Sequence, residues 1–150
     1  MTEPTTDLLE VTYERVYQAP RELVFECMTT PEHLTHFWGP PGVSTPIENI
    51  TIDLRVGGAF DTTMVDDATG AEYPNFGEYV EIDPPARLAF REKGNDEGMT
   101  TTIDFIDQGD GTTLTITRQV NVPAMFATPE AQAGMTSSFD RFDVYLTTIT

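Results

Sequence analysis

Two histidines three residues apart are the first side chains whose type and spacing suggest chemistry. His33 and His36 would lie on one side of a helix, where a pair of imidazoles can contribute to a metal site. Zinc would require further ligands, yet the sequence holds no other histidine and a single cysteine, Cys27. We therefore expect no metal site and interpret the pair as residues of a helix surface.

Patterns typical of covalent or phosphate chemistry are also missing from the sequence. No serine stands in a nucleophile-elbow context, and Gly57-Gly58 lacks the following helix that a phosphate-binding loop requires. The 25 acidic residues could supply an acid–base pair, but their spacing singles out none of them. The sequence predicts no cofactor and favours a binding protein over an enzyme, while it leaves the question of catalysis open.

The charge balance narrows the possible partners. Against 25 acidic residues stand only 8 basic ones, which gives a formal net charge of −17 and argues against nucleic acid or an anionic membrane as a partner. No apolar run is long enough to span a membrane, and residues 1–7 are too polar for a signal peptide. With one cysteine and no possible intrachain disulfide, we expect a cytoplasmic protein, either a monomer or a homodimer.

The element that must position any site is a long helix predicted over residues 128–149. Thr128 suits its N-cap, Pro129 its first position and Glu130 the positive end of its dipole. At about 1.5 Å per residue this helix would span about 28 Å, the width of a small domain. Its apolar stripe consists of Ala131, Met135, Phe139, Phe142, Leu146 and Ile149. The helix either serves as a plain core helix or also roofs a cavity, an alternative that the small residues beside its stripe keep open.

Nearly everything before this helix alternates like β-structure. The expected elements are a strand over 9–18, short helices over 21–28 and 30–37, and strands near 50–54, 59–66, 76–82, 87–92, 100–107 and 112–120. Phe76 and Ile82 are expected to face inward on one strand, and Leu114 and Ile116 on another. Short spacing between strands and segregated helices predict an α+β domain with an antiparallel sheet of six or seven strands. One domain over residues 1–150 fits the length of the chain.

Five motifs occur in an order that resembles one protein family. They are His33–Gly42 (HLTHFWGPPG), Asp53–Phe60 (DLRVGGAF), Gly77–Leu88 (GEYVEIDPPARL), Gly109–Thr117 (GDGTTLTIT) and Gly134–Leu146 (GMTSSFDRFDVYL). Together they resemble the bacterial branch related to the heat-shock-protein-90 ATPase activator, within the START-like, SRPBCC superfamily. The resemblance covers about residues 9–146. It implies a helix-grip fold, in which a curved antiparallel sheet wraps around the C-terminal helix and two short helices follow the first strand.

The resemblance also implies a cavity between that helix and the sheet. The leading hypothesis is a small soluble domain that binds an apolar or amphipathic molecule there. The candidate ligand-binding residues are Phe37, Trp38, Phe60, Met64, Phe76, Glu78, Phe90, Met135, Phe139 and Phe142. Glu78 and Arg15 are the expected polar groups, and Arg15 is either an edge residue or a buried charge that needs a carboxylate.

Three further features of the resemblance bear on function. Many relatives carry Trp where this chain has Met135, so the roof of the cavity should be softer and no relative's ligand can be transferred. Two alternatives come from other classes of protein. One is an enzyme of the polyketide cyclase/aromatase type, and the other is a co-chaperone-like module that binds a protein partner through its surface.

Overall fold

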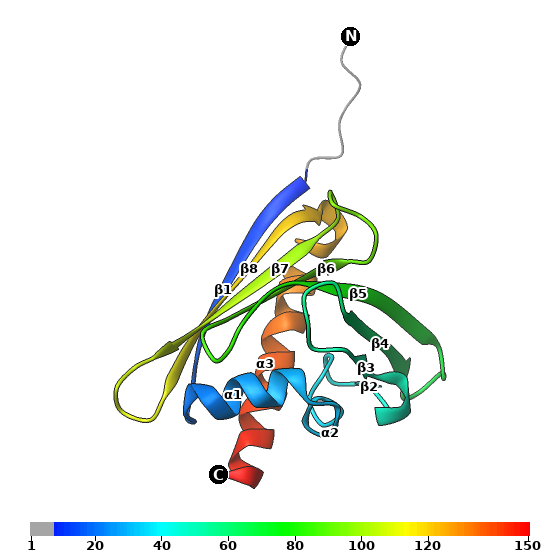
Figure 1. The fold of residues 1–150 in the computed structure, drawn as a ribbon. Coiled ribbons are helices and arrows are strands. Elements are labelled where there is room, and N and C mark those ends of the chain that lie inside the picture. Colours follow the sequence, from blue (N-terminus) through cyan, green and yellow to red (C-terminus); the bar gives the residue numbers. More distant parts are fainter. Residues whose placement is uncertain (1–7) are drawn as a thin grey trace.

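Eight strands pair in one antiparallel sheet that curves around a long C-terminal helix (Figure 1). The structure is a computed structural model that describes residues 8–150, so the segment 1–7 assessed above as too polar for a signal peptide lies outside the described residues. The strands are β1 Leu8–Tyr17, β2 Val43–Ser44, β3 Thr51–Ile52, β4 Ala59–Asp66, β5 Glu72–Asp83, β6 Arg87–Glu92, β7 Thr100–Asp107 and β8 Thr113–Pro123. The helices are α1 Arg21–Thr29, α2 Pro31–Leu34 and α3 Pro129–Ile149, with 3-10 turns η1 Ile47–Asn49 and η2 Ala124–Phe126.

The sheet has β1 at one edge and β2 at the other, in the order β1-β8-β7-β6-β5-β4-β2, and β3 pairs separately with β4. The predicted α+β helix-grip fold is confirmed. Eight strands form instead of the expected six or seven: β3 falls within the predicted strand 50–54, and the additional strand is β2, which contains only two residues. The second short helix ends at Leu34 rather than at the expected Phe37, and turns complete the segment before Gly39.

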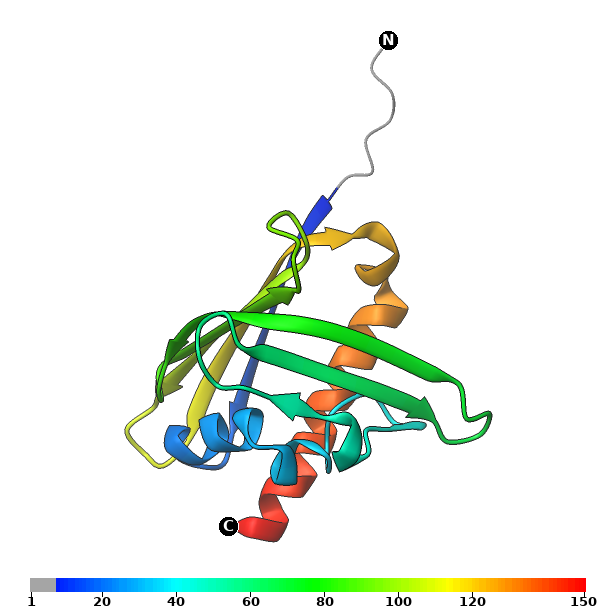
Figure 2. The same cartoon turned by 45° about the vertical axis from the view of Figure 1, so that its right-hand side comes forward.

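The ends of α3 follow from its sequence. The Thr128 hydroxyl accepts a hydrogen bond from the Ala131 amide at 3.2 Å, and Pro129 occupies the first turn, where no amide donor is needed. Figure 2 shows α3 running beneath the concave face of the sheet, with the long strands β4 and β5 crossing it. Phe142 and Leu146 are its buried residues, whereas Ile149, expected in the apolar stripe, is 37% exposed. No helix within residues 8–150 is long and apolar enough to cross a membrane.

The inward face of β8 differs from the prediction. Thr113, Thr115 and Thr117 are buried beneath α3, whereas Leu114 and Ile116 lie half-buried on the outer face. The register explains this: Leu114 pairs with Val16 of β1 and Ile106 of β7, which form an apolar row across the outside of the sheet. An apolar residue in a strand thus packs against cross-strand neighbours, and its apolarity alone does not identify the core face.

The predicted inward face of β5 is also wrong. Gly77 and Tyr79 are buried on the concave face, and Phe76 points outward with 56% of its surface exposed. A register shift between Tyr79 and Glu81 then turns the strand, so that Ile82 packs against the core as expected. Counting by twos across this bulge puts Phe76 on the wrong side.

Candidate functional site

Aromatic side chains from distant parts of the sequence pack together under the C-terminal half of α3. Phe142 is 1% exposed and stacks on Phe37 with ring centroids 4.1 Å apart, and the tilted ring of Tyr17 also packs against it, with centroids 4.8 Å apart. We call these three residues the aromatic stack. Phe37 and Phe142, both predicted ligand-binding residues, are therefore brought together, and they pack on each other at this end.

A second aromatic group joins the short helices to the sheet. Trp38 meets Phe60 edge-on at 5.4 Å, and Phe60 in turn contacts Phe90 at 4.8 Å and stacks on Tyr79. The Trp38 carbonyl also accepts a hydrogen bond from the Thr45 hydroxyl at 2.9 Å. Trp38 therefore acts as a staple between the segment after α2 and strand β4, one of the two roles that its sequence context suggests.

Under the N-terminal half of α3, residues 129–139, the facing side chains are less well covered. Met135 and Phe139 on the helix are half-buried, and Phe139 meets Tyr13 of β1 edge-on at 5.6 Å. Met64 and Phe90 on the concave face are half-buried as well, and we call Met64, Phe90, Met135 and Phe139 the half-buried wall. Tyr73, paired with Met64 across β4 and β5, lies on the same face and is 49% exposed. No residue of α3 before Phe142 is buried, in contrast to the aromatic stack.

Polar groups that the sequence analysis missed also lie on the inner face of the sheet. The buried inner face of β8 carries three threonines and Gln119, and neighbouring β7 adds Thr101. The Thr113 hydroxyl donates to the Ala19 carbonyl at 2.7 Å and the Thr115 hydroxyl to the Arg15 carbonyl at 3.2 Å. The alternation of Thr113, Thr115 and Thr117 was visible in the sequence, but only the pairing with β1 shows which face it occupies.

Three tyrosine hydroxyls in the interior have no protein partner. The hydroxyls of Tyr13, Tyr17 and Tyr79 are buried and find no hydrogen-bond partner within residues 8–150. Burial raises the pKa of each of these phenols above its ordinary value, so all three are neutral near pH 7 and can both donate and accept. Burying an unpaired hydroxyl costs free energy, about 1–3 kcal/mol, and such groups need explanation when they occur together.

Glu78 does not face the helix. Its carboxylate accepts hydrogen bonds from Arg91 Nε at 3.1 Å and from the Gly94 amide at 3.3 Å. It lies on the outer face, since its neighbours Gly77 and Tyr79 take the inner one. The hydrogen bond from Arg91 has the largest effect on the pKa of Glu78 and the hydrogen bond from the Gly94 amide the next largest. Together they hold this pKa below its ordinary value. Its predicted place among the inward-facing polar groups is wrong.

Arg15 combines both roles that the sequence analysis left open. It lies on edge strand β1, and its guanidinium reaches under α3 to the carboxylates of Asp140, at 2.7 Å, and Asp143. Burial of the guanidinium acts to lower the pKa of Arg15, but its hydrogen bonds and charge interactions with Asp143 and Asp140 outweigh burial and raise this pKa above its ordinary value. Arg15 therefore ties the edge of the sheet to the middle of the helix.

Neither Cys27 nor the histidines show the features of a catalytic group. Burial, and then the nearby Glu26, raise the pKa of the Cys27 thiol to about 12, which makes a reactive thiolate scarce at neutral pH. His33 Nδ1 lies 2.6 Å from the Tyr145 hydroxyl, and the His36 ring stacks on Tyr145 with centroids 4.9 Å apart. Both histidines thus pack on α3 instead of lying on an open helix surface.

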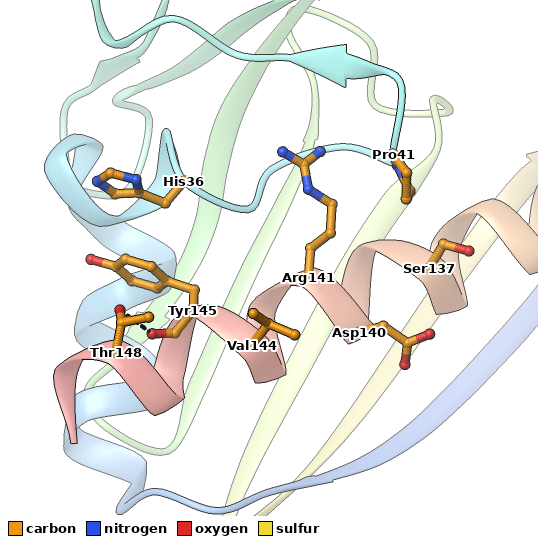
Figure 3. Close-up of a pocket in the computed structure, with 8 residues that line it drawn as sticks. All are labelled: His36, Pro41, Ser137, Asp140, Arg141, Val144, Tyr145 and Thr148. Atoms are coloured by element: carbon orange, nitrogen blue, oxygen red, sulfur yellow. Dashed lines mark hydrogen bonds between the residues drawn. The ribbon is translucent and has the colours of Figure 1, made fainter.

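A hollow of about 470 Å³ opens on the flank of α3 that faces the loop after α2 (Figure 3). Its lining residues are His36, Pro41, Ser137, Asp140, Arg141, Val144, Tyr145 and Thr148. None of the predicted ligand-binding residues is among them. The lining of the hollow combines apolar and charged side chains. Its α3 residues are not those of the apolar stripe, so the hollow uses a different side of the helix from the half-buried wall.

Comparison with known proteins identifies a matching family and solved structures with the same architecture. The family model described as "Activator of Hsp90 ATPase homolog 1-like protein" matches residues 18–147. No curated protein matches the sequence. Among solved structures, a protein from Nitrosomonas europaea is 23% identical with a TM-score of 0.82, covering 93% of this chain and 95% of its own. A protein from Chromobacterium violaceum is 27% identical with a TM-score of 0.78, covering 91% and 96%. An AHSA1-like protein from Aeromonas hydrophila is 20% identical with a TM-score of 0.80, covering 94% of each chain.

Proposed function

The chain belongs to the family of proteins like the activator of Hsp90 ATPase homologue 1, and on that basis we propose that it is a single START-like domain that binds a small amphipathic molecule. The molecule would lie between the N-terminal half of α3 and the concave face of the sheet. The predicted cytoplasmic location and monomeric or homodimeric state belong to the same proposal.

One observation carries this proposal: apolar side chains on α3 and on the sheet stay half-buried, although Phe142, one helical turn beyond Phe139, is packed tightly. Met135 and Phe139 on α3, like Met64 and Phe90 on the sheet, retain exposed surface, whereas Phe142 retains 1%. Completing the burial of such side chains is favourable, by about 25 cal/mol for each Å² removed from water. An apolar guest between the two surfaces would supply that burial.

The polar interior supports an amphipathic rather than a purely apolar guest. The unpartnered hydroxyls of Tyr13 and Tyr79 are buried near the half-buried wall, since Tyr13 contacts Phe139 and Tyr79 contacts Phe90. A ligand hydroxyl or carbonyl that reached them would satisfy groups that the protein leaves unpaired. Binding sites commonly combine apolar walls with a few polar groups of this kind, which fix the orientation of the ligand.

The two alternative functions have less support. Glu78, the acid that the sequence suggested, lies on the outer face in contact with Arg91, so it is poorly placed to act on a molecule under the helix. For a protein-binding role, the family description refers to an ATPase activator, but no described surface is matched to a partner. That role becomes the favoured one if no small molecule binds.

A fluorescence titration tests the proposal, because Trp38 is the only tryptophan and packs against Phe60 of the concave face. We expect 4-hexylphenol, a neutral amphipathic probe, to change the Trp38 emission saturably. Met64→Arg should weaken this binding by about tenfold or more, because a charge among the apolar side chains must be desolvated. Val56→Arg, the same new charge at a position that is 65% exposed, should leave the titration unchanged.

The contrary results are equally definite. Identical titrations of the wild type and a folded Met64→Arg variant would show that the probe binds elsewhere. No saturable response to a panel of alkylphenols, fatty alcohols and hydroxylated polycyclic molecules would contradict a ligand-binding function and favour the protein-binding alternative.

A further inference from the structure

We propose that the hollow on the flank of α3 is a second binding site, separate from the space under the helix, and that it takes a small organic carboxylate with a flat apolar body. The site is centred on Arg141, with His36 and Tyr145 on one side and Pro41 and Val144 as its apolar surface (Figure 3).

The first argument is the charge of Arg141. Six of the eight basic residues pair with a carboxylate: Arg15, Arg55, Arg87, Arg91, Lys93 and Arg118. Within residues 8–150, Arg21 and Arg141 have no such partner. In a chain with 25 acidic residues, a guanidinium without a carboxylate is unusual, and Arg141 is the one that lines the hollow. An arginine in this state is complementary to a carboxylate ligand.

The second argument is the use that Arg141 makes of its donors. Nη1 donates to the carbonyls of Gly39, Pro40 and Val43, at 2.8, 3.0 and 3.1 Å, which holds the loop after α2 against the helix. These bonds fix the guanidinium in place, and the structure records none from Nε or Nη2 to residues 8–150. A guanidinium has five N–H donors in a rigid fork, so one edge of a pre-oriented fork stays available.

The third argument is the position of the neighbouring acids. Asp140 precedes Arg141 in the sequence and Asp143 follows it by two positions, but both carboxylates bind Arg15 on strand β1. Figure 3 shows Asp140 turned away from Arg141. Arg15 thus occupies the two acids that could otherwise neutralise Arg141, and the hollow keeps a positive group on a protein of net charge −17.

The side chains that line the hollow indicate the shape and polarity of the uncharged part of the ligand. Val144 is an apolar side chain that stays 66% exposed within residues 8–150. Beside it the rings of His36 and Tyr145 stack nearly parallel, inclined by 11°, and both residues line the hollow, so they add flat aromatic groups to its lining. A volume of about 470 Å³ is in the range of small-molecule sites. A planar acid such as an aromatic carboxylate would place its ring on these surfaces and its charge on Arg141.

The test uses the full chain, with benzoate as the probe and benzamide as its uncharged counterpart of the same shape. NMR spectra would follow the Arg141 Nε–H signal, the Tyr145 ring and the backbone amides of 137–148. We expect benzoate to shift these signals saturably and to bind about tenfold or more tightly than benzamide, because only benzoate carries the charge that Arg141 attracts. Val144→Asp should weaken benzoate binding by about tenfold, through repulsion at close range.

Val144→Asn is the matched control, since asparagine has about the size and polarity of aspartate without its charge. This variant should bind benzoate with an affinity within about threefold of that of the wild type. Equal affinities for benzoate and benzamide, or equal effects of the two variants, would overturn the proposal. So would the absence of saturable shifts. Benzoate shifts at Phe90 that Met64→Arg abolishes would assign the binding to the space under the helix, and this would overturn the second site while leaving the proposed function intact.

Discussion

Replacing Phe142 by alanine is expected to destabilise the protein by about 3–5 kcal/mol, the usual cost of removing a large aromatic side chain from a core. Phe142 is 1% exposed and packs against both Phe37 and Tyr17, so its loss opens a cavity in the aromatic stack that its neighbours cannot readily fill. Urea unfolding monitored by circular dichroism measures the change as a shift of the midpoint at constant slope.

The matched control is Val144→Ala, two positions along the same helix. Val144 is 66% exposed, and the variant should stay within about 0.5 kcal/mol of the wild type. Because domains of this size are stable by only about 5–15 kcal/mol, Phe142→Leu offers a milder second variant, with an expected cost of about 1–1.5 kcal/mol. A loss below about 1 kcal/mol for Phe142→Ala would show that α3 does not depend on the aromatic stack.

The second large effect is expected at Gly58, in the connection that leads into β4. A Cβ atom there would clash with the backbone carbonyl oxygen of Asp53 and would lie 2.9 Å from that of Arg55. The Gly58 carbonyl also accepts the Tyr79 amide at 3.0 Å, so any adjustment disturbs the start of the β4–β5 pairing. Gly58→Ala should therefore destabilise the fold by about 1–3 kcal/mol.

The same substitution at Gly134 should have the opposite effect on stability. Gly134 lies within α3, and a Cβ there meets nothing within 4 Å. Alanine is favoured over glycine in a helix by up to about 1 kcal/mol, so Gly134→Ala should raise the melting temperature. Calorimetry on the two variants separates crowding from backbone preference. Equal shifts of the two would contradict the close approach at Gly58.

The sequence was sufficient for the elements whose local signals agree with their tertiary use. The boundaries of α3 follow from Thr128, Pro129 and the apolar stripe, and those of β6 and β7 coincide with the predicted ranges 87–92 and 100–107. Here alternation, caps and packing point to the same structure. The family resemblance supplied the curvature of the sheet and the place of the helix, which periodicity does not encode.

The faces of β5 and β8 could not be predicted, for different physical reasons. On β8, apolar residues pack on the outside against β1 and β7, while Thr113 and Thr117 turn inward, so hydrophobicity misidentifies the core face. On β5, a bulge near Val80 breaks the period of two, which places Phe76 outside and Ile82 inside.

Arg141 escaped sequence analysis because its significance depends on distant residues. Its charge is left without a carboxylate only because Arg15, on the first strand, binds Asp140 and Asp143. Its donors are oriented by carbonyls of the loop after α2. No spacing along the chain reports contacts between positions more than a hundred residues apart, so the hollow became visible only in the structure.

The most direct measurement of the proposed function uses the methionines, of which the chain has six. With ¹³C-methyl methionine, each methyl group gives one NMR signal, assigned by methionine-to-leucine variants. Met64 and Met135 lie on the two faces of the half-buried wall, Met28 is 8% exposed on α1, and Met125 is 70% exposed on η2. Addition of 4-hexylphenol should shift the Met64 and Met135 signals together, with one common affinity, and leave that of Met28 in place. Shifts confined to Met125, or no saturable shift at Met64 and Met135, would contradict a binding site between α3 and the sheet.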